Sequence, residues 1–67
     1  MNLTKIQNQI LELLAKGFRY NEICDELSLN RNSLGRNLKE VRQMIGVDST
    51  QLAVKAWLEL SEQSHAD

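Results

Sequence analysis

Apolar residues recur at helical spacing in the first quarter of the chain. The positions that share one face are Ile6, Ile10, Leu13 and Leu14. Thr4 is followed three residues later by Gln7, which is the pattern of a capping box at a helix start. Gly17 then supplies a residue suited to a left-handed helix end. This stretch therefore predicts a helix over 5–16.

Two more helices are predicted on either side of a short turn. The apolar positions of the first are Ile23, Cys24 and Leu27, and those of the second are Leu34, Leu38, Val41 and Ile45. Ser28 and Leu29 turn the chain, Asn30 is a favourable N-cap, and Gly46 stops the second apolar stripe. We expect helices over 21–27 and 31–45.

A fourth helix is expected over 49–62, where Asp48 with Gln51 repeats the capping-box pattern. Its expected buried face consists of Leu52, Ala53, Ala56, Trp57 and Leu60. The tail, residues 63–67, is expected to fray. The chain is thus predicted to be a single all-α domain, 1–67, of four helices.

Composition agrees with continuous helices, because the 67 residues contain no proline and only three glycines. No stretch approaches the roughly 20 apolar residues of a membrane span, so the cytoplasm is the expected location. The single cysteine, Cys24, lies on the buried stripe and is interpreted as a packed thiol rather than a redox sensor.

Neither a catalytic nor a metal site is visible in the sequence. Cys24 and His65 lie 41 positions apart, and the carboxylates are scattered along the chain. We therefore expect no catalytic residue, no metal, no cofactor and no enzymatic activity.

The charged residues are unevenly distributed, although the net charge is only -1. Residues 30–47 hold four basic side chains and one acidic, whereas 1–29 hold three and four, and 48–67 hold one and four. Positive potential is therefore concentrated on the third predicted helix, as a phosphate-facing element requires.

At 100° per residue, the basic and amide side chains of that helix fall within an arc of about 140° opposite the apolar stripe. The arc contains Arg31, Asn32, Gly35, Arg36, Lys39, Arg42 and Gln43, with Glu40 near its margin. Arg and Lys can bind guanine or phosphate, Asn and Gln can read adenine, and Gly35 permits a close approach of the backbone. The alternative interpretation is an ordinary solvated helix face.

From Leu3 to about Trp57 the chain resembles the LuxR-type, or GerE-like, helix-turn-helix domain. Leu3-Thr4 followed by Ile10-Leu11-Glu12-Leu13-Leu14-Ala15-Lys16-Gly17 is similar to the family's L-T and V-L-x-L-L-A-x-G. Further similarities, in chain order, are Glu22-Ile23, Leu27, Leu29, Ser33-Leu34, Gly46-Val47 and Ala53-Val54.

This resemblance implies a four-helix domain that binds DNA in transcriptional regulation, with residues 31–45 as the recognition helix in the major groove. By position in the family pattern, the base-facing and groove-lining residues are Arg31, Asn32, Gly35, Arg36 and Lys39. Ser33 corresponds to the family's backbone-clamping hydroxyl, and Arg42 adds positive charge to the same helix.

The sequence also departs from the family pattern. Ile6, Gln7 and Gln9 replace a charged R-E-x-E segment, and the usual Lys, His, Asn, Lys and Arg are replaced by Gly35, Asn37, Glu40, Met44 and Thr50. The alternative function is therefore a protein-interaction module or anti-activator that uses the same fold to bind another regulator.

The fourth predicted helix has a second apolar edge. Val54 and Leu58 are four residues apart and are expected to point away from the core. Since the family commonly pairs subunits through its last helix, the resemblance implies a weak homodimer with Val54 and Leu58 at its interface.

Overall fold

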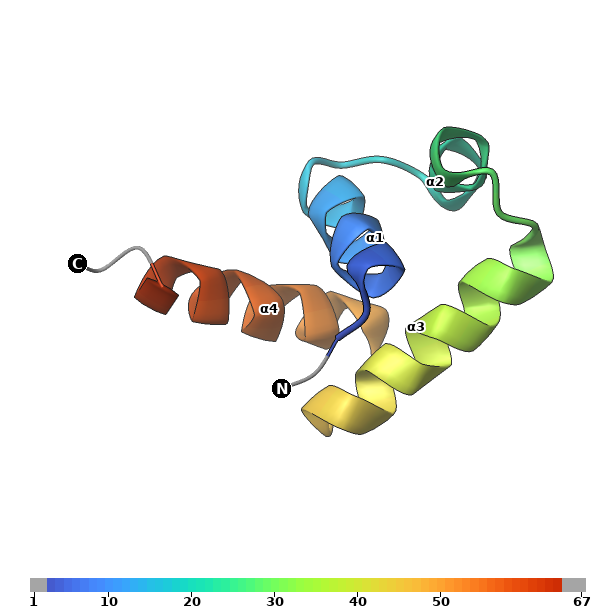
Figure 1. Cartoon of the computed structure of the whole chain (residues 1–67). Coiled ribbons are helices and arrows are strands. Elements are labelled where there is room, and N and C mark those ends of the chain that lie inside the picture. The colour runs from blue at the N-terminus through green and yellow to red at the C-terminus, as the bar shows by residue number, and fades with distance from the viewer. Residues whose placement is uncertain (1–2, 65–67) are drawn as a thin grey trace.

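The computed structural model describes residues 3–64, with side chains through residue 60, and this part of the chain forms four helices and no strand (Figure 1). They are α1 (Lys5–Ala15), α2 (Tyr20–Leu27), α3 (Arg31–Ile45) and α4 (Thr50–Ser64). The all-α prediction is confirmed, and helix ends differ from expectation by at most two residues. The tail expected to fray over 63–67 is helical through Ser64, while residues 65–67 lie outside the described residues.

Side-chain caps explain where α1 and α3 begin. The Gln7 amide donates to Thr4 Oγ1, and the Thr4 amide donates to Gln7 Oε1, each over 3.1 Å. The capping box predicted for α1 is therefore confirmed. Asn30 Oδ1 accepts from the Ser33 amide at 2.7 Å, which confirms Asn30 as the cap of α3.

The start of α4 differs from the prediction. Ser49 Oγ accepts from the Leu52 amide at 3.2 Å, so Ser49 rather than Asp48 supplies the side-chain cap. Both residue types are good caps, and the structure selects the one adjacent to the first helical residue, Thr50.

The connection between α2 and α3 is a three-residue turn. Ser28 adopts left-handed backbone angles, with φ 55° and ψ 41°, and is the one non-glycine residue with positive φ in the described part of the chain. The Leu29 amide donates to the Cys24 carbonyl at 2.9 Å. This short, hydrogen-bonded turn joins α2 to α3.

The core consists of two clusters that meet at α1. Ile10, Ile23, Leu34 and Leu38 form the first, between α1, α2 and α3. Leu11, Val41 and Ala53 form the second, between α1, α3 and α4. Since α3 contributes to both clusters, its apolar stripe is held inward along its length, and its opposite face is left to solvent.

Half-buried side chains complete each cluster. Cys24 packs against the first cluster, as its position on the apolar stripe predicts. Trp57 packs against the second, and its Nε1 donates to Asn8 Oδ1 of α1 at 3.0 Å. Trp57 is thus part of the contact between α1 and α4.

The orientation of α4 corrects one expectation. Leu52 and Leu60, expected in the core, are 50% and 41% exposed. Val54, expected to point outward, packs against the second cluster, whereas Leu58 is 40% exposed as expected. The helix is therefore rotated about its axis from the expected orientation, so that Ala53, Val54 and Trp57 face inward.

Candidate nucleic-acid interface

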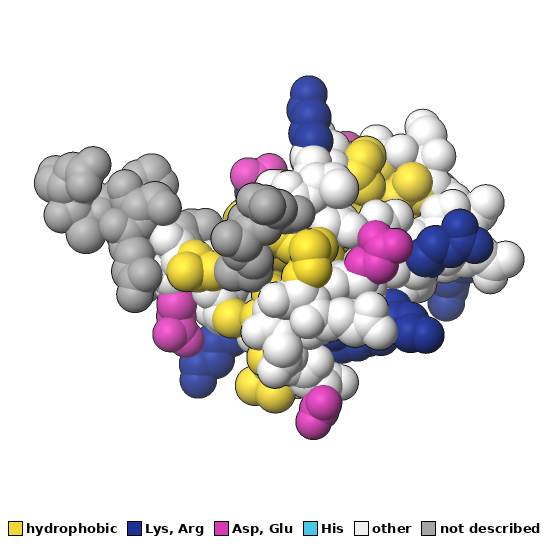
Figure 2. All heavy atoms as spheres, turned by 60° about the horizontal axis from the view of Figure 1, so that its bottom comes forward, with side chains coloured by type: hydrophobic (Ala, Val, Ile, Leu, Met, Phe, Trp, Pro, Cys, Tyr) yellow, Lys and Arg dark blue, Asp and Glu magenta, His cyan; other side chains and the backbone are white. Residues whose placement is uncertain are grey.

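Most of the predicted site residues lie on one solvent-exposed face of α3. We call it the basic face, and its exposed members are Arg31, Asn32, Gly35, Arg36, Lys39 and Gln43. The packing of Leu34, Leu38 and Val41 into the core turns these side chains outward together. Figure 2 shows several Lys and Arg side chains gathered on the right of the view, over α3. Six of the seven residues of the predicted arc are thus exposed, the exception being Arg42.

The cations of the basic face are not used to hold the fold together. Arg31, Arg36 and Lys39 make no ion pair or side-chain hydrogen bond within the described residues. By contrast, Lys16 Nζ lies 3.9 Å from Glu12 Oε1. Because their charge is not neutralised by a neighbouring carboxylate, these three cations are available to an anionic partner.

Ser33 lies at the margin of this surface and is half-buried. Its amide donates to the Asn30 side chain, and its carbonyl accepts from Asn37 Nδ2 at 2.9 Å. The Ser33 amide is therefore already bonded, so of the two chemical groups that could contact a phosphate at this residue, the hydroxyl is the one remaining.

Arg42, predicted as part of the same site, has a different position. It is half-buried, and its Nη1 donates to Thr50 Oγ1 at 3.0 Å, at the start of α4. Arg42 therefore differs from the three unpaired cations of the basic face, because its side chain contacts Thr50 and links α3 to α4. Its guanidinium still adds positive charge beside the basic face.

The buried side chain of Gln7 makes a polar contact between α1 and α3 that the sequence did not reveal. Gln7 is 1% exposed, and its Nε2 donates to Glu40 Oε1 at 2.9 Å and to Asn37 Oδ1 at 3.3 Å. In the sequence, Gln7 stands out only as part of the capping box and as a departure from the charged segment of the family pattern. The capping-box pattern identified its role in α1, but no local signal reports a contact 33 positions away.

α3 is consequently held at both margins by polar contacts. Glu40 and Asn37 bond to α1 on one side, and Arg42 bonds to α4 on the other. The basic face lies between these margins. This arrangement fixes the rotation of α3 about its axis, which determines the direction in which Arg36 and Lys39 project.

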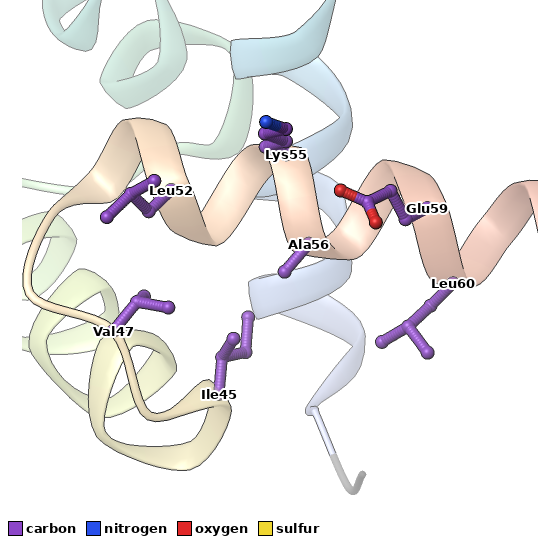
Figure 3. A pocket seen from close by; sticks show the side chains of 7 residues that line it. All are labelled: Ile45, Val47, Leu52, Lys55, Ala56, Glu59 and Leu60. Carbon is purple, nitrogen blue, oxygen red and sulfur yellow. The ribbon is translucent and has the colours of Figure 1, made fainter.

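A second surface feature lies on α4, away from the basic face. It is an open hollow of about 500 Å³ between α4 and the segment that follows α3. Figure 3 shows its apolar lining with Lys55 and Glu59 along one edge. The lining residues are Ile45, Val47, Leu52, Lys55, Ala56, Glu59 and Leu60.

No family model, curated protein or solved structure matches this chain. Within the described residues, no group of three or more His, Cys, Asp or Glu side chains could hold a metal ion. The helices described here also lack the combination of length and apolar character that crossing a membrane requires. The candidate site therefore rests on the geometry of α3.

Proposed function

We propose that this chain is a helix-turn-helix DNA-binding module that acts in transcriptional regulation. In this proposal α3 lies in the major groove and α2 lies across the DNA backbone. The observation that carries the proposal is the basic face, whose three exposed cations have no partner among the described residues. The three-residue turn before α3 supports the same motif.

Each part of the basic face has a contact suited to its chemistry. Arg36 and Lys39, near the middle of α3, bind guanine edges or phosphates, and Asn32 and Gln43 read adenine. Arg31, in the first turn of α3, binds the DNA backbone. Phosphate contacts position the helix, and base contacts give the sequence preference.

We further propose that the domain is of the LuxR type. Gln7 and Glu40 stand where that family's pattern has Glu and Asn, and here Gln7 Nε2 lies 2.9 Å from Glu40 Oε1. Relative to the family pattern, position 7 changes from a carboxylate to an amide and position 40 changes from an amide to a carboxylate. The two side chains are in contact. A paired exchange that keeps one donor and one acceptor supports a common arrangement of α1 and α3.

The proposed partner besides DNA is a second copy of this chain. Because Val54 packs inward, we move the interface expected at Val54 and Leu58 to another row of α4. Leu52, Ala56 and Leu60 form an exposed or half-buried row on α4 with Ala56 at its centre. In an antiparallel pair of α4 helices, Leu52 of each copy faces Leu60 of the other. Lys55 of one copy then lies beside Glu59 of the other, so the surface is self-complementary in shape and charge.

This self-association is expected to be weak. Three side chains cover much less than the roughly 800 Å² per partner of a standard interface. Binding of both copies to one DNA site would strengthen the pair through effective concentration. We place the module in the cytoplasm, where its unpaired thiol, Cys24, remains reduced.

The test is an anisotropy titration with labelled mixed genomic DNA at two salt concentrations. Affinity should fall steeply with salt, because each phosphate contact releases counterions and contributes a slope of about -0.9 in log affinity against log salt. Three open cations predict a slope of roughly -3 for one copy. Absence of DNA binding at low salt would reject the proposal.

The hollow on α4 favours one second candidate, a protein-interaction module that binds another regulator. Its lining is largely apolar, and Leu52 and Leu60 are substantially exposed there. In that case binding depends on apolar burial and changes little with salt. Retention of a purified regulator without affinity for DNA would favour this candidate.

A further inference from the structure

The three glycines of the chain fall into two classes. Gly17 and Gly46 have positive φ values of 95° and 84°, at the ends of α1 and α3. Gly35 instead lies inside α3 and is absent from the positive-φ residues. Backbone geometry therefore explains the first two glycines but not Gly35.

Packing within the domain does not explain Gly35 either. A Cβ at this position would meet no atom of the described part of the chain within 4 Å, apart from its chain neighbours and its own helix backbone. Gly35 is also exposed. Apart from proline, glycine is the least favourable residue in a helix interior, so Gly35 weakens α3 without benefit to the isolated fold.

Gly35 lies on the basic face, between two exposed cations. Arg31 precedes it by four residues and Lys39 follows it by four, each one helical turn or about 6 Å along the axis. Both neighbours are exposed cations. The face thus presents bare backbone between two positive charges.

We propose that Gly35 is the point of closest approach between α3 and DNA and sets the depth of the helix in the major groove. This inference rests on the proposed function. In this chain a side chain added at position 35, even a methyl group, would lift α3 from this depth and lengthen the contacts of the neighbouring cations; the Lys that the LuxR-type pattern has here would keep the helix farther from the groove floor. Helix stability and DNA affinity therefore place opposite demands on this position.

The experiment compares Gly35→Ala with the unmodified protein in thermal unfolding and in DNA anisotropy titrations at fixed salt. Ala should raise the unfolding midpoint by roughly 4 to 8 °C, because it favours the helix. It should also weaken DNA binding by roughly tenfold, a change of about 1.4 kcal/mol. Gln51→Ala, an exposed change on α4, is the control and should leave affinity unchanged.

The outcomes separate this inference from the function on which it rests. A stabilised Gly35→Ala variant with unchanged affinity would overturn the role of Gly35 and leave DNA binding intact. A lower midpoint would refute the premise that the fold does not need this glycine. If the unmodified protein does not bind DNA at low salt, both the function and the role of Gly35 are wrong.

Discussion

The side-chain amide of Gln7 connects the start of α1 to the middle of α3. Its oxygen accepts from the Thr4 amide, and its nitrogen donates to Asn37 and Glu40. A buried polar group needs such partners, because leaving one unbonded costs about 1 to 3 kcal/mol. Gln7 therefore contributes to stability through its amide chemistry as well as its volume.

Gln7→Glu should lower the free energy of unfolding by about 1 to 3 kcal/mol near neutral pH, since it replaces a donor with a second carboxylate beside Glu40. Protonation of either carboxyl relieves the repulsion, so the loss should shrink as the pH falls. The double variant Gln7→Glu with Glu40→Gln restores one donor and one acceptor. Denaturant unfolding of the double variant should recover most of the loss; an equally unstable double variant would show that this contact contributes little.

Substitution of Ser28 can test the left-handed backbone conformation of the turn between α2 and α3. A non-glycine residue in the left-handed region costs roughly 1 to 2 kcal/mol, and Ser28 has φ 55°. Ser28→Gly should therefore raise stability by about 1 kcal/mol, measured by thermal unfolding. Asn30→Gly in the same turn should instead lower the stability, because it removes the side-chain cap of α3. A destabilised Ser28→Gly variant would indicate that the turn has a different conformation.

Helix positions could be predicted from the sequence because their signals are local. Each signal involves residues only a few positions apart: the capping box at Thr4, the N-cap at Asn30 and the spacing of the apolar residues. The structure contains each of them. The rotation of α4 could not be predicted in this way. Its sequence has apolar residues on more than one edge, and contacts with Leu11 and Val41 select the edge containing Ala53.

The candidate site shows the same division between local and distant information. The apolar stripe of α3 is narrow, so the opposite positions of Arg36 and Lys39 follow directly from helical periodicity. The position of Arg42 depends on where Thr50 lies, and that of Glu40 depends on Gln7. Those contacts arise only when α1 and α4 pack on α3.

Charge reversal on α3 tests whether the basic face binds DNA. Arg36→Glu combined with Lys39→Glu should abolish detectable binding in anisotropy titrations, because two attractive contacts become repulsive. Both side chains are exposed and have no ion pair among the described residues, so the free energy of unfolding should change by no more than about 0.5 kcal/mol. Circular dichroism checks that the helices are retained.

The matched control for charge reversal is Lys5→Glu with Lys16→Glu. These exposed lysines lie at the start of α1 and at its C-cap, outside the basic face and the proposed α4 interface, and the change in net charge is identical. At physiological salt, charges separated by more than about 8 Å are largely screened, so the control should retain most of the affinity. Equal loss in both double variants would indicate a general charge effect rather than a site on α3.

Most of the large exposed hydrophobic side chains lie outside α3, which carries the basic face. Leu52, Leu58 and Leu60 are on α4 and Tyr20 is on α2, whereas Met44 is on α3. The domain measures 36 × 21 × 18 Å, and successive major grooves on one side of DNA lie about 34 Å apart. In the pair proposed above, the two α3 helices would need this spacing, which is close to the length of one copy.

Disruption of the α4 row should separate the copies without unfolding them. Leu52→Asp with Leu60→Asp places two carboxylates at each end of the proposed pair, and both positions are exposed in a single copy. Sedimentation of the unmodified protein at hundreds of micromolar should show dimers, whereas the variant should remain a monomer that binds one half-site but not a palindrome cooperatively.

Leu58→Asp, on the α4 edge outside the row, is the control and should still dimerise. A dimer lost only on Leu58→Asp would move the interface to the other edge of α4, and a monomeric unmodified protein with no preference for palindromes would refute pairing through this helix.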